Sequence, residues 1–378
     1  MRYHFVVCFH WGEINPLQAN PLWYCYDEAR TQMKKDLADN NVAWDATEEW
    51  LWLSLDSMRQ NAERSGLYVP TDNEFSHRYS FSATPDMISG AFEAVEYGNS
   101  SDARVIMLAR YNTWPWNHAK GSMRAIAAAM GAESSTVEQM ITSFKETYYD
   151  GGWYDQLVKA GIPTPVTYIW RDGPALMNLS ANFQDACLFF EQNRDSWSTN
   201  PDGIHDPHYF LKTYKALNGK WMGGKLPYKD LYEGVMEALR WIDRDETLMI
   251  REFVPIMTTG AALGLTPLDA DYIEDPVEWR YIFHNGNLIA KGPNRNYLPA
   301  DILRRLNERT DEFLALAVKA NSALATDWNC LDIALTATGI PFVVEVNAGI
   351  SSGLPWNSAP NYYENLFASI IKREDSKL

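Results

Sequence analysis

The sequence has few cysteines and no long hydrophobic run, and each shortage excludes a class of protein. Its four cysteines lie far apart among 378 residues, without a Cys-x-x-Cys pair. That pattern is unlike a disulfide framework or a zinc site and is typical of buried free thiols in a reducing compartment. No stretch approaches the roughly 18 apolar residues of a membrane span, and the apolar run near the N-terminus is too short for a signal peptide. We therefore expect a cytoplasmic protein.

Positive charge is also scarce in the chain as a whole. There are 33 lysines and arginines against 49 acidic residues, which gives a formal charge of −16 and argues against non-specific nucleic-acid binding. A hydrophobic content of 46% is enough for a sizeable folded core. The charge is reversed locally, because residues 207–229 contain five lysines and no acid. This window can bind an anionic ligand although the protein is acidic.

Hydrophobic periodicity and turn residues predict a mixed chain of helices and strands without internal repeats. Proline and glycine gather at 161–167, directly after a predicted helix, and we expect the main domain boundary in this part of the chain. Strands are expected at 5–9, 105–108, 166–170, 209–213, 248–254, 279–283, 288–290, 328–336 and 342–346. Helices are expected at 27–37, 48–62, 85–95, 122–130, 138–149, 153–160, 231–241 and 302–324.

The last predicted hairpin carries the most informative side chains. On its second strand Glu345 and Asn347 share one face, because strand side chains alternate, and on its first strand Asp332 lies among branched apolar residues. A turn centred on Thr338 and Gly339 would set Asp332 directly opposite Glu345. Two buried, opposed carboxylates repel each other unless a cation lies between them. Carboxylate and amide oxygens suit Mg²⁺, so we expect a magnesium site here.

A phosphate-binding element is expected upstream of this hairpin. Lys212 ends an apolar strand, and a glycine-containing loop at 215–225, with Lys220 in it, follows. Backbone amides of such loops and lysine side chains hold phosphates. The loop is not a Walker A motif, because GxxxxGK[ST] is absent. Further along, the strand end at 251–255 offers backbone groups and an apolar wall to a purine.

Other interpretations of these residues stay open. The two acids of the hairpin can be solvated on an exposed sheet face, or they can form a catalytic acid–base pair as in glycosidases. The lysines of 207–229 can belong to a solvated loop. Glu278 and Arg280, two residues apart on a predicted strand, can form an ordinary surface ion pair.

Taken in order, these elements resemble the ATP-grasp superfamily. The chain is most similar to the often phage-associated clade that has two motif arginines and one strand lysine. The elements that carry the resemblance are Lys212 at a strand end, the glycine and lysine loop, Arg251-Glu252-Phe253-Val254, Glu278-x-Arg280, Asp332, and Glu345-x-Asn347. The resemblance covers about residues 150–365 of the chain.

The resemblance implies a fold of the α+β or α/β class, with an N-terminal α/β domain followed by a two-lobed ATP-grasp fold. We expect an N-terminal domain that serves substrate binding at 1–150, a first ATP-grasp lobe at 151–255, and a second lobe with the metal site at 256–378. Residues 1–150 match no family by their motifs, and substrate specificity is expected to lie there.

The resemblance also implies ATP and Mg²⁺ as cofactors and a role for each matching residue. The transferred phosphate would be stabilised by Arg280, Arg251 and Lys212. ATP would be held by Lys212, Lys220, Glu252, Phe253 and Val254. Mg²⁺ would be bound by Asp332, Glu345 and Asn347, and the substrate by Ser351, Ser352 and Gly353. For a second ATP lysine upstream, the nearest candidate is Lys159.

ATP-grasp enzymes make an acyl phosphate from a carboxylate and ATP, and an amine or thiol then displaces the phosphate. The resemblance therefore implies a carboxylate–amine (or thiol) ligase that joins a small-molecule or peptide carboxylate to an amine acceptor through a C–N bond. A kinase on the same fold and a non-catalytic nucleotide-binding interaction protein remain alternatives. No membrane or nucleic-acid partner is expected.

Overall fold

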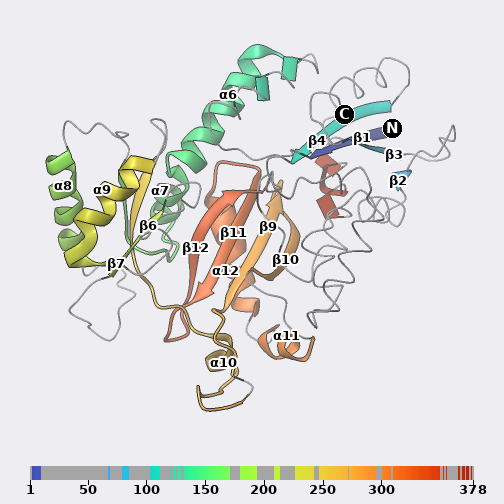
Figure 1. Ribbon diagram of the computed structural model, residues 1–378. Helices are drawn as coiled ribbons and strands as arrows, with labels where there is room; N and C mark the ends of the chain where they lie inside the picture. The colour runs from blue at the N-terminus through green and yellow to red at the C-terminus, as the bar shows by residue number, and fades with distance from the viewer. Residues whose placement is uncertain are drawn as a thin grey trace, which may run out of the picture. The chain divides into compact units, whose positions relative to one another are not determined.

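The computed structural model describes the chain in separate stretches (Figure 1). These are 2–9, 67–68, 79–84, 103–110, 132–170, 179–193, 208–212, 226–241, 247–270, 272–294, 300–307 and 310–349, with isolated residues between 120 and 128 and between 352 and 376. The predicted helices at 27–37, 48–62 and 85–95 lie outside the described residues, as does most of the one at 122–130.

The described strands and helices follow one another in a mixed order, and no described helix is long and apolar enough to cross a membrane. The strands are β1 (Arg2–Phe9), β2 (Leu67–Tyr68), β3 (Tyr79–Thr84), β4 (Ala103–Arg110), β5 (Thr167–Trp170), β6 (His208–Lys212), β7 (Leu226–Pro227), β8 (Leu248–Glu252), β9 (Glu278–His284), β10 (Asn287–Pro293), β11 (Trp328–Leu335) and β12 (Pro341–Ala348). The helices are α6 (Ser134–Phe144), the π-helix η3 (Lys145–Tyr149), α7 (Gly152–Lys159), α8 (Leu179–Gln192), the 3₁₀ helix η5 (Tyr228–Asp230), α9 (Leu231–Trp241), α10 (Thr259–Ala262), α11 (Ala300–Asn307) and α12 (Thr310–Ala323).

The chain divides into two compact units, each built from more than one segment. The first contains Met1–Ile141, Ile282–Leu298 and Ala348–Leu378, and the second contains Thr142–Tyr281 and Pro299–Asn347. The three domains expected at 1–150, 151–255 and 256–378 stay a prediction.

The first unit contains a parallel sheet with the strand order β2-β3-β1-β4. Its central strand β1 pairs with β3 on one side and with β4 on the other, so that Phe5 lies opposite both Phe81 and Ile106. The strands predicted at 5–9 and 105–108 are confirmed, whereas β2 and β3 were not predicted. Parallel neighbours require crossover connections, and here the connecting segments lie outside the described residues.

The turn between β9 and β10 lies at Asn285 and Gly286. Both residues have left-handed backbone angles, with φ of 50° and 73°, as a two-residue hairpin turn of this sequence requires. Beside the turn, the Ser369 hydroxyl donates to the carbonyl oxygen of His284 at 3.0 Å and lies 2.9 Å from His284 Nδ1. These buried bonds hold the C-terminal segment against the hairpin.

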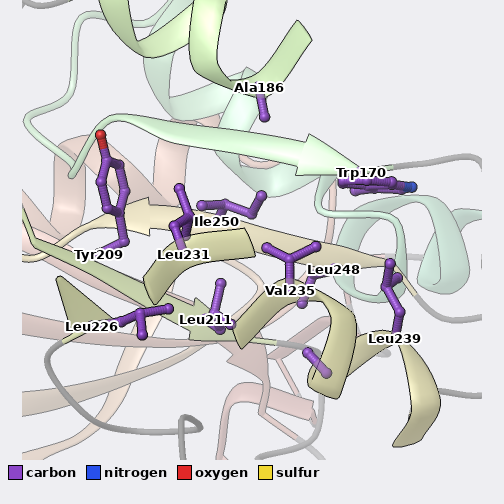
Figure 2. Packing of buried hydrophobic residues seen from close by; sticks show 11 residues of the cluster. Trp170, Ala186, Tyr209, Leu211, Leu226, Leu231, Val235, Leu239, Leu248 and Ile250 are labelled. Atoms are coloured by element: carbon purple, nitrogen blue, oxygen red, sulfur yellow. The ribbon is translucent and has the colours of Figure 1, made fainter. Parts of the chain in front are cut away.

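In the second unit, one sheet has the order β5-β8-β6-β7 with antiparallel neighbours. Side chains that alternate along its strands meet side chains of α8 and α9 in a hydrophobic core (Figure 2). The buried members of this core are Trp170, Ala186, Tyr209, Leu211, Leu226, Leu231, Val235, Ala238, Leu239, Leu248 and Ile250. Burial of this apolar surface fixes which face of the sheet is left for polar residues.

The opposite face of the same sheet carries two of the predicted site residues. Lys212 pairs with Met249 across β6 and β8, and Arg251 pairs with Phe210 on β6 and with Thr167 on β5. Directly paired residues share a face, and so do residues two apart on one strand. Lys212 and Arg251 therefore lie on one face of the sheet, away from the core.

Another sheet has the order β10-β9-β11-β12, and its strand β11 belongs to the second unit. Its strand β11 is buried from Asn329 to Leu335, and α12 contacts it. On α12, Phe313, Ala317 and Ala320 are fully buried. An acid placed on β11 is therefore removed from water.

The prediction of one helix at 302–324 is wrong. The structure has two helices, because α11 ends at Asn307 and α12 begins at Thr310. A threonine followed by two acids, here Asp311 and Glu312, favours the start of a new helix, and this signal was missed. The other strands and helices predicted from residue 138 onward agree with the described elements to within a few residues, except that the last turns of the helix at 138–149 form a π-helix; α8, β7 and α10 were not predicted.

The turn between β11 and β12 differs from the symmetric turn expected at Thr338 and Gly339. The amide of Thr336 donates to the carbonyl of Ile340 at 2.9 Å, and the amide of Gly339 donates to the carbonyl of Thr336 at 2.8 Å. Thr336 therefore lies opposite two residues, which is a bulge with Gly339 in the left-handed conformation, φ 85°.

The bulge changes the expected pairing at the turn by one residue, because Thr336 lies opposite Ile340 and not opposite Pro341. Ala334 and Phe342 belong to one buried cluster, against which Val344 packs. The direct pairing of Asp332 with Glu345 stays a prediction.

The start of α7 has no room for a side chain at Gly152. A Cβ atom there would lie 2.5 Å from the backbone oxygen of Glu146. Gly152→Ala should lower the free energy of unfolding by about 1–3 kcal/mol, as measured by urea denaturation. Val158→Ala, at a position of the same helix that is 51% exposed, should change it by less than about 0.5 kcal/mol. Equal effects of the two substitutions would contradict the steric explanation.

Candidate functional site

Six charged side chains come together in the second unit, around Lys212. Its ammonium group contacts the Glu345 carboxylate and lies within electrostatic range of the other four. The six are Lys212 of β6, Arg251 of β8, Glu278 and Arg280 of β9, Asp332 of β11 and Glu345 of β12. Three cations and three acids give this cluster no net charge. The structure therefore gathers the strand lysine, both motif arginines and both metal-binding acids that the sequence predicted.

The pair formed by Arg280 and Asp332 is the most buried part of the cluster. Arg280 Nε donates to Asp332 Oδ1 at 2.8 Å, and its Nη2 donates to Oδ2 at 2.7 Å. The Asp332 side chain is fully buried and that of Arg280 is 13% exposed. Burial by itself would lower the pKa of Arg280, but Asp332 and the nearby acids raise it above its ordinary value. Arg280 is thus held as a fixed cation by a two-point contact.

Lys212 and Asn347 occupy the two oxygens of the Glu345 carboxylate. Lys212 Nζ contacts Oε2, and Asn347 Nδ2 donates to Oε1. Burial is the largest influence on Lys212 and lowers its pKa to about 7; Arg251 lowers it as well, whereas Asp332 and Glu278 act in the opposite direction. Contact with the Glu345 carboxylate also favours the charged form. Lys212 therefore titrates near neutral pH, and its acidic neighbours favour the charged form.

Arg251 is buried and only partly satisfied by its neighbours. Its Nε donates to Thr167 Oγ1 at 3.2 Å, and its guanidinium carbon lies 5.6 Å from the ring centre of Trp153. Burial lowers the pKa of Arg251 to about 10. Its Nη2 has no hydrogen-bond partner among the described residues. Sequence reasoning missed Thr167 and Trp153, because strand pairing brings together residues that no local pattern connects.

The predicted adenine-binding segment follows β8. The backbone amides of Glu252 and Phe253 each donate to a carbonyl of a neighbouring segment at 2.8 Å, so the sheet already uses both. Val254 is buried in a cluster with Ala334 of β11 and Phe342 of β12. The segment therefore joins the two sheets of this region through an apolar contact, and its role at the adenine stays a prediction.

The structure describes only some of the remaining predicted residues. Lys220, Ser351 and Gly353 lie outside the described residues. Ser352 is buried, and its hydroxyl donates to the Ala348 carbonyl at 2.7 Å. Lys159 is exposed at the end of α7.

The donor set of Asp332, Glu345 and Asn347 suits a magnesium ion better than a metal held by protein ligands alone. Among the described residues, no three His, Cys, Asp or Glu side chains lie close enough together to hold a metal. Mg²⁺ is usually bound by one or two carboxylates, with substrate phosphates and water completing its coordination. Two carboxylates and one amide oxygen, beside Lys212 and Arg280 that can bind phosphate, fit this pattern.

Comparison with known families gives one match. Residues 231–370 match the family described as ATP-grasp domain, R2K clade family 3. The matched region contains every predicted residue of the adenine, arginine and metal motifs, and it begins after Lys212. No curated protein sequence matches the chain.

Comparison with solved structures gives weak likenesses along almost the whole chain. D-cycloserine synthetase DcsG is 11% identical, with a TM-score of 0.45, and the match covers 96% of this chain and 98% of that one. ATP-grasp ligase PsnB, complexed with a minimal precursor, is 13% identical with a TM-score of 0.44, and the match covers 98% of this chain and 100% of that one. D-alanine–D-alanine ligase from Bacillus anthracis, complexed with ATP, is 13% identical with a TM-score of 0.43, and the match covers 98% of this chain and 96% of that one. The family match shows that residues 231–370 are similar to an ATP-grasp domain, and the mixed helices and sheets of the described residues agree with the α+β class of that fold.

Proposed function

We propose that the chain is an ATP- and Mg²⁺-dependent ligase that joins a carboxylate to an amine or thiol through an acyl phosphate. One observation carries the proposal: Lys212 and Arg280 lie beside Asp332 and Glu345, and all of these except Lys212 belong to the region that matches an ATP-grasp domain. Phosphoryl transfer needs positioned cations more than a protein nucleophile, and these residues provide the cations.

In this proposal the carboxylate oxygen of the first substrate attacks the γ-phosphorus of ATP, and the bond to the β,γ-bridging oxygen breaks with release of ADP. The amine then attacks the acyl carbon, loses a proton and expels inorganic phosphate. Lys212 and Arg280 neutralise the phosphate oxygens while charge moves between them. Arg251, with its unpartnered Nη2 beside Lys212, adds to the same positive field.

Bound Mg²⁺ would neutralise charge on the phosphates, and Asp332, Glu345 and Asn347 are the residues that would hold it. Asn347 would have to turn its amide, because its nitrogen now faces Glu345. Glu252 and Val254 would contact the adenine, and Lys220 and 351–353 would hold phosphate and substrate.

The substrates we propose are a small-molecule or peptide carboxylate and an amine acceptor in the cytoplasm. We assign their selection to residues 1–150, ahead of lobes at 151–255 and 256–378. Support for this division comes from the motifs alone, since all of the ATP-binding motifs follow residue 150.

The reaction is tested by measuring ADP and phosphate with a panel of carboxylates and amines. A ligase forms both products only when a carboxylate and an amine are supplied together. ADP formed with a phosphorylated product and no second substrate would indicate a kinase instead. No ADP with any pair would favour a non-catalytic nucleotide-binding protein and contradict the ligase.

Lys212 should contribute more to nucleotide binding than any surface lysine of the same window. Lys212→Met should weaken binding of a non-hydrolysable ATP analogue about 10- to 100-fold, because a charge-assisted bond to phosphate contributes about 1.5–3 kcal/mol. Lys229→Met, at an exposed lysine 17 residues further on, should change it less than about twofold. Calorimetry measures both, and equal losses would remove Lys212 from the site.

A further inference from the structure

Every carboxylate oxygen of the two proposed metal-binding acids already has a donor from the chain itself. Arg280 occupies Oδ1 and Oδ2 of Asp332. Lys212 contacts Oε2 of Glu345, and Asn347 donates to Oε1. A divalent cation at these oxygens would lie beside the Lys212 ammonium and the Arg280 guanidinium, and the repulsion is relieved only if at least one of these internal donors moves away.

The charge balance of the cluster also indicates that an internal ion pair must separate before a metal binds. Its three cations and three acids are balanced, so a divalent cation that took Glu345 by itself would lie beside the unpaired charge of Lys212. A triphosphate alone would likewise bind beside three acids. If both bind, the phosphates take the side-chain cations and the metal takes the acids, and every charge keeps an opposite partner.

The two internal ion pairs differ in how easily they exchange. Arg280 holds the fully buried Asp332 with a planar two-point contact, whereas Lys212 makes a point contact through a flexible chain to the partly exposed Glu345. The Glu345 side chain is 21% exposed and that of Asp332 is 0% exposed. Lys212 is therefore the donor that can leave its acid at the lower cost.

We propose that Lys212 closes the metal site of the nucleotide-free protein by occupying Glu345, and that a bound triphosphate opens the site by drawing Lys212 onto its phosphates. This inference rests on the proposed function, since it assigns that function's metal and nucleotide sites to one exchangeable lysine. It makes the binding of nucleotide and metal mutually dependent, and thermodynamic linkage requires each to strengthen the other by the same factor.

The test is a titration of the nucleotide-free protein with Mn²⁺, followed by electron paramagnetic resonance of the free ion. Lys212→Met should bind Mn²⁺ at least about 10-fold more tightly than the unchanged protein, within the range of typical coupling between two sites. Lys212→Arg, which keeps the charge, and Lys229→Met should not gain affinity. Adding Glu345→Gln to Lys212→Met should abolish the gain, because the opened site then lacks its acid.

Two results would overturn the inference. One is a Lys212→Met protein, shown to be folded by circular dichroism, that binds Mn²⁺ no more tightly than the unchanged protein; Lys212→Gln serves the same comparison if the methionine variant does not fold. The other is an unchanged protein that binds Mn²⁺ equally well with and without an ATP analogue. Failure of the unchanged protein to bind the analogue in the presence of metal would instead contradict the proposed function, so the two failures are distinguishable.

Discussion

Arg280→Met should lower the free energy of unfolding by about 3–5 kcal/mol, as measured by urea denaturation without ligands. The reason is that Asp332 has no exposed surface and receives both of its hydrogen bonds from Arg280. Without the guanidinium group, the buried carboxylate loses both of its hydrogen-bond donors, and the opposite charge left within its range is that of Lys212, with which it interacts only electrostatically. The loss of stability therefore comes mainly from leaving a buried acid unpaired, and less from losing the attraction between the two charges.

The chain offers a matched control in Arg124, which makes the same two-point contact to Glu138, at 2.6 and 2.7 Å, on the surface. Arg124→Met should leave the stability almost unchanged, because solvent replaces the lost partner. The double variant Arg280→Met with Asp332→Leu should lose less stability than Arg280→Met alone, since no charge is then stranded. Equal losses from Arg280→Met and Arg124→Met would show that the Arg280 pair is not buried as described.

Glu345→Gln should reduce Mg²⁺-dependent ADP formation by at least about 100-fold, the scale on which loss of one electrostatic contact to the reacting phosphate affects catalysis. The substitution keeps the size of the side chain and removes the charge that would hold the metal. It also releases Lys212 from its ion pair, so binding of ATP without Mg²⁺ should not weaken. Steady-state assays and calorimetry measure the two effects separately.

The control for this variant is Glu312→Gln, at an exposed acid in the first turn of α12. It should leave the rate within about twofold, because its charge is screened by solvent. Loss of ATP binding in Glu345→Gln, both with and without Mg²⁺, would show that Glu345 supports the fold and not the metal.

The sequence predicted most of the site because strand side chains alternate and the site residues lie on predicted strands. Lys212 ends β6, and Asp332 and Glu345 lie on β11 and β12 as expected. Alternation along one strand is a local property, so it can be read without knowing which strands are neighbours.

Pairing between strands could not be predicted in the same way. A symmetric turn would set Thr336 opposite Pro341, and the bulge at Gly339 sets it opposite Ile340 instead. A turn of this length can close with or without the extra residue, and hydrogen bonds of the neighbouring segments decide between the two.

For a related reason, the sequence did not show that each of the two acids pairs with a cation of its own. Arg280 and Lys212 reach Asp332 and Glu345 across 52 and 133 residues of chain, so only the assembled sheets show which cation meets which acid. The sequence suggested instead that one metal ion must neutralise both acids. In the structure each acid has its own partner, and the predicted metal site becomes one that must be opened before it is filled.

The measurement that tests the account most directly is calorimetric titration of a non-hydrolysable ATP analogue into the unchanged protein and into Glu345→Gln, each with and without Mg²⁺. The account predicts that Mg²⁺ strengthens binding to the unchanged protein by at least about 10-fold and leaves binding to Glu345→Gln unaltered. An unchanged protein that does not bind the analogue in either condition, or an equal effect of Mg²⁺ on both proteins, would contradict it.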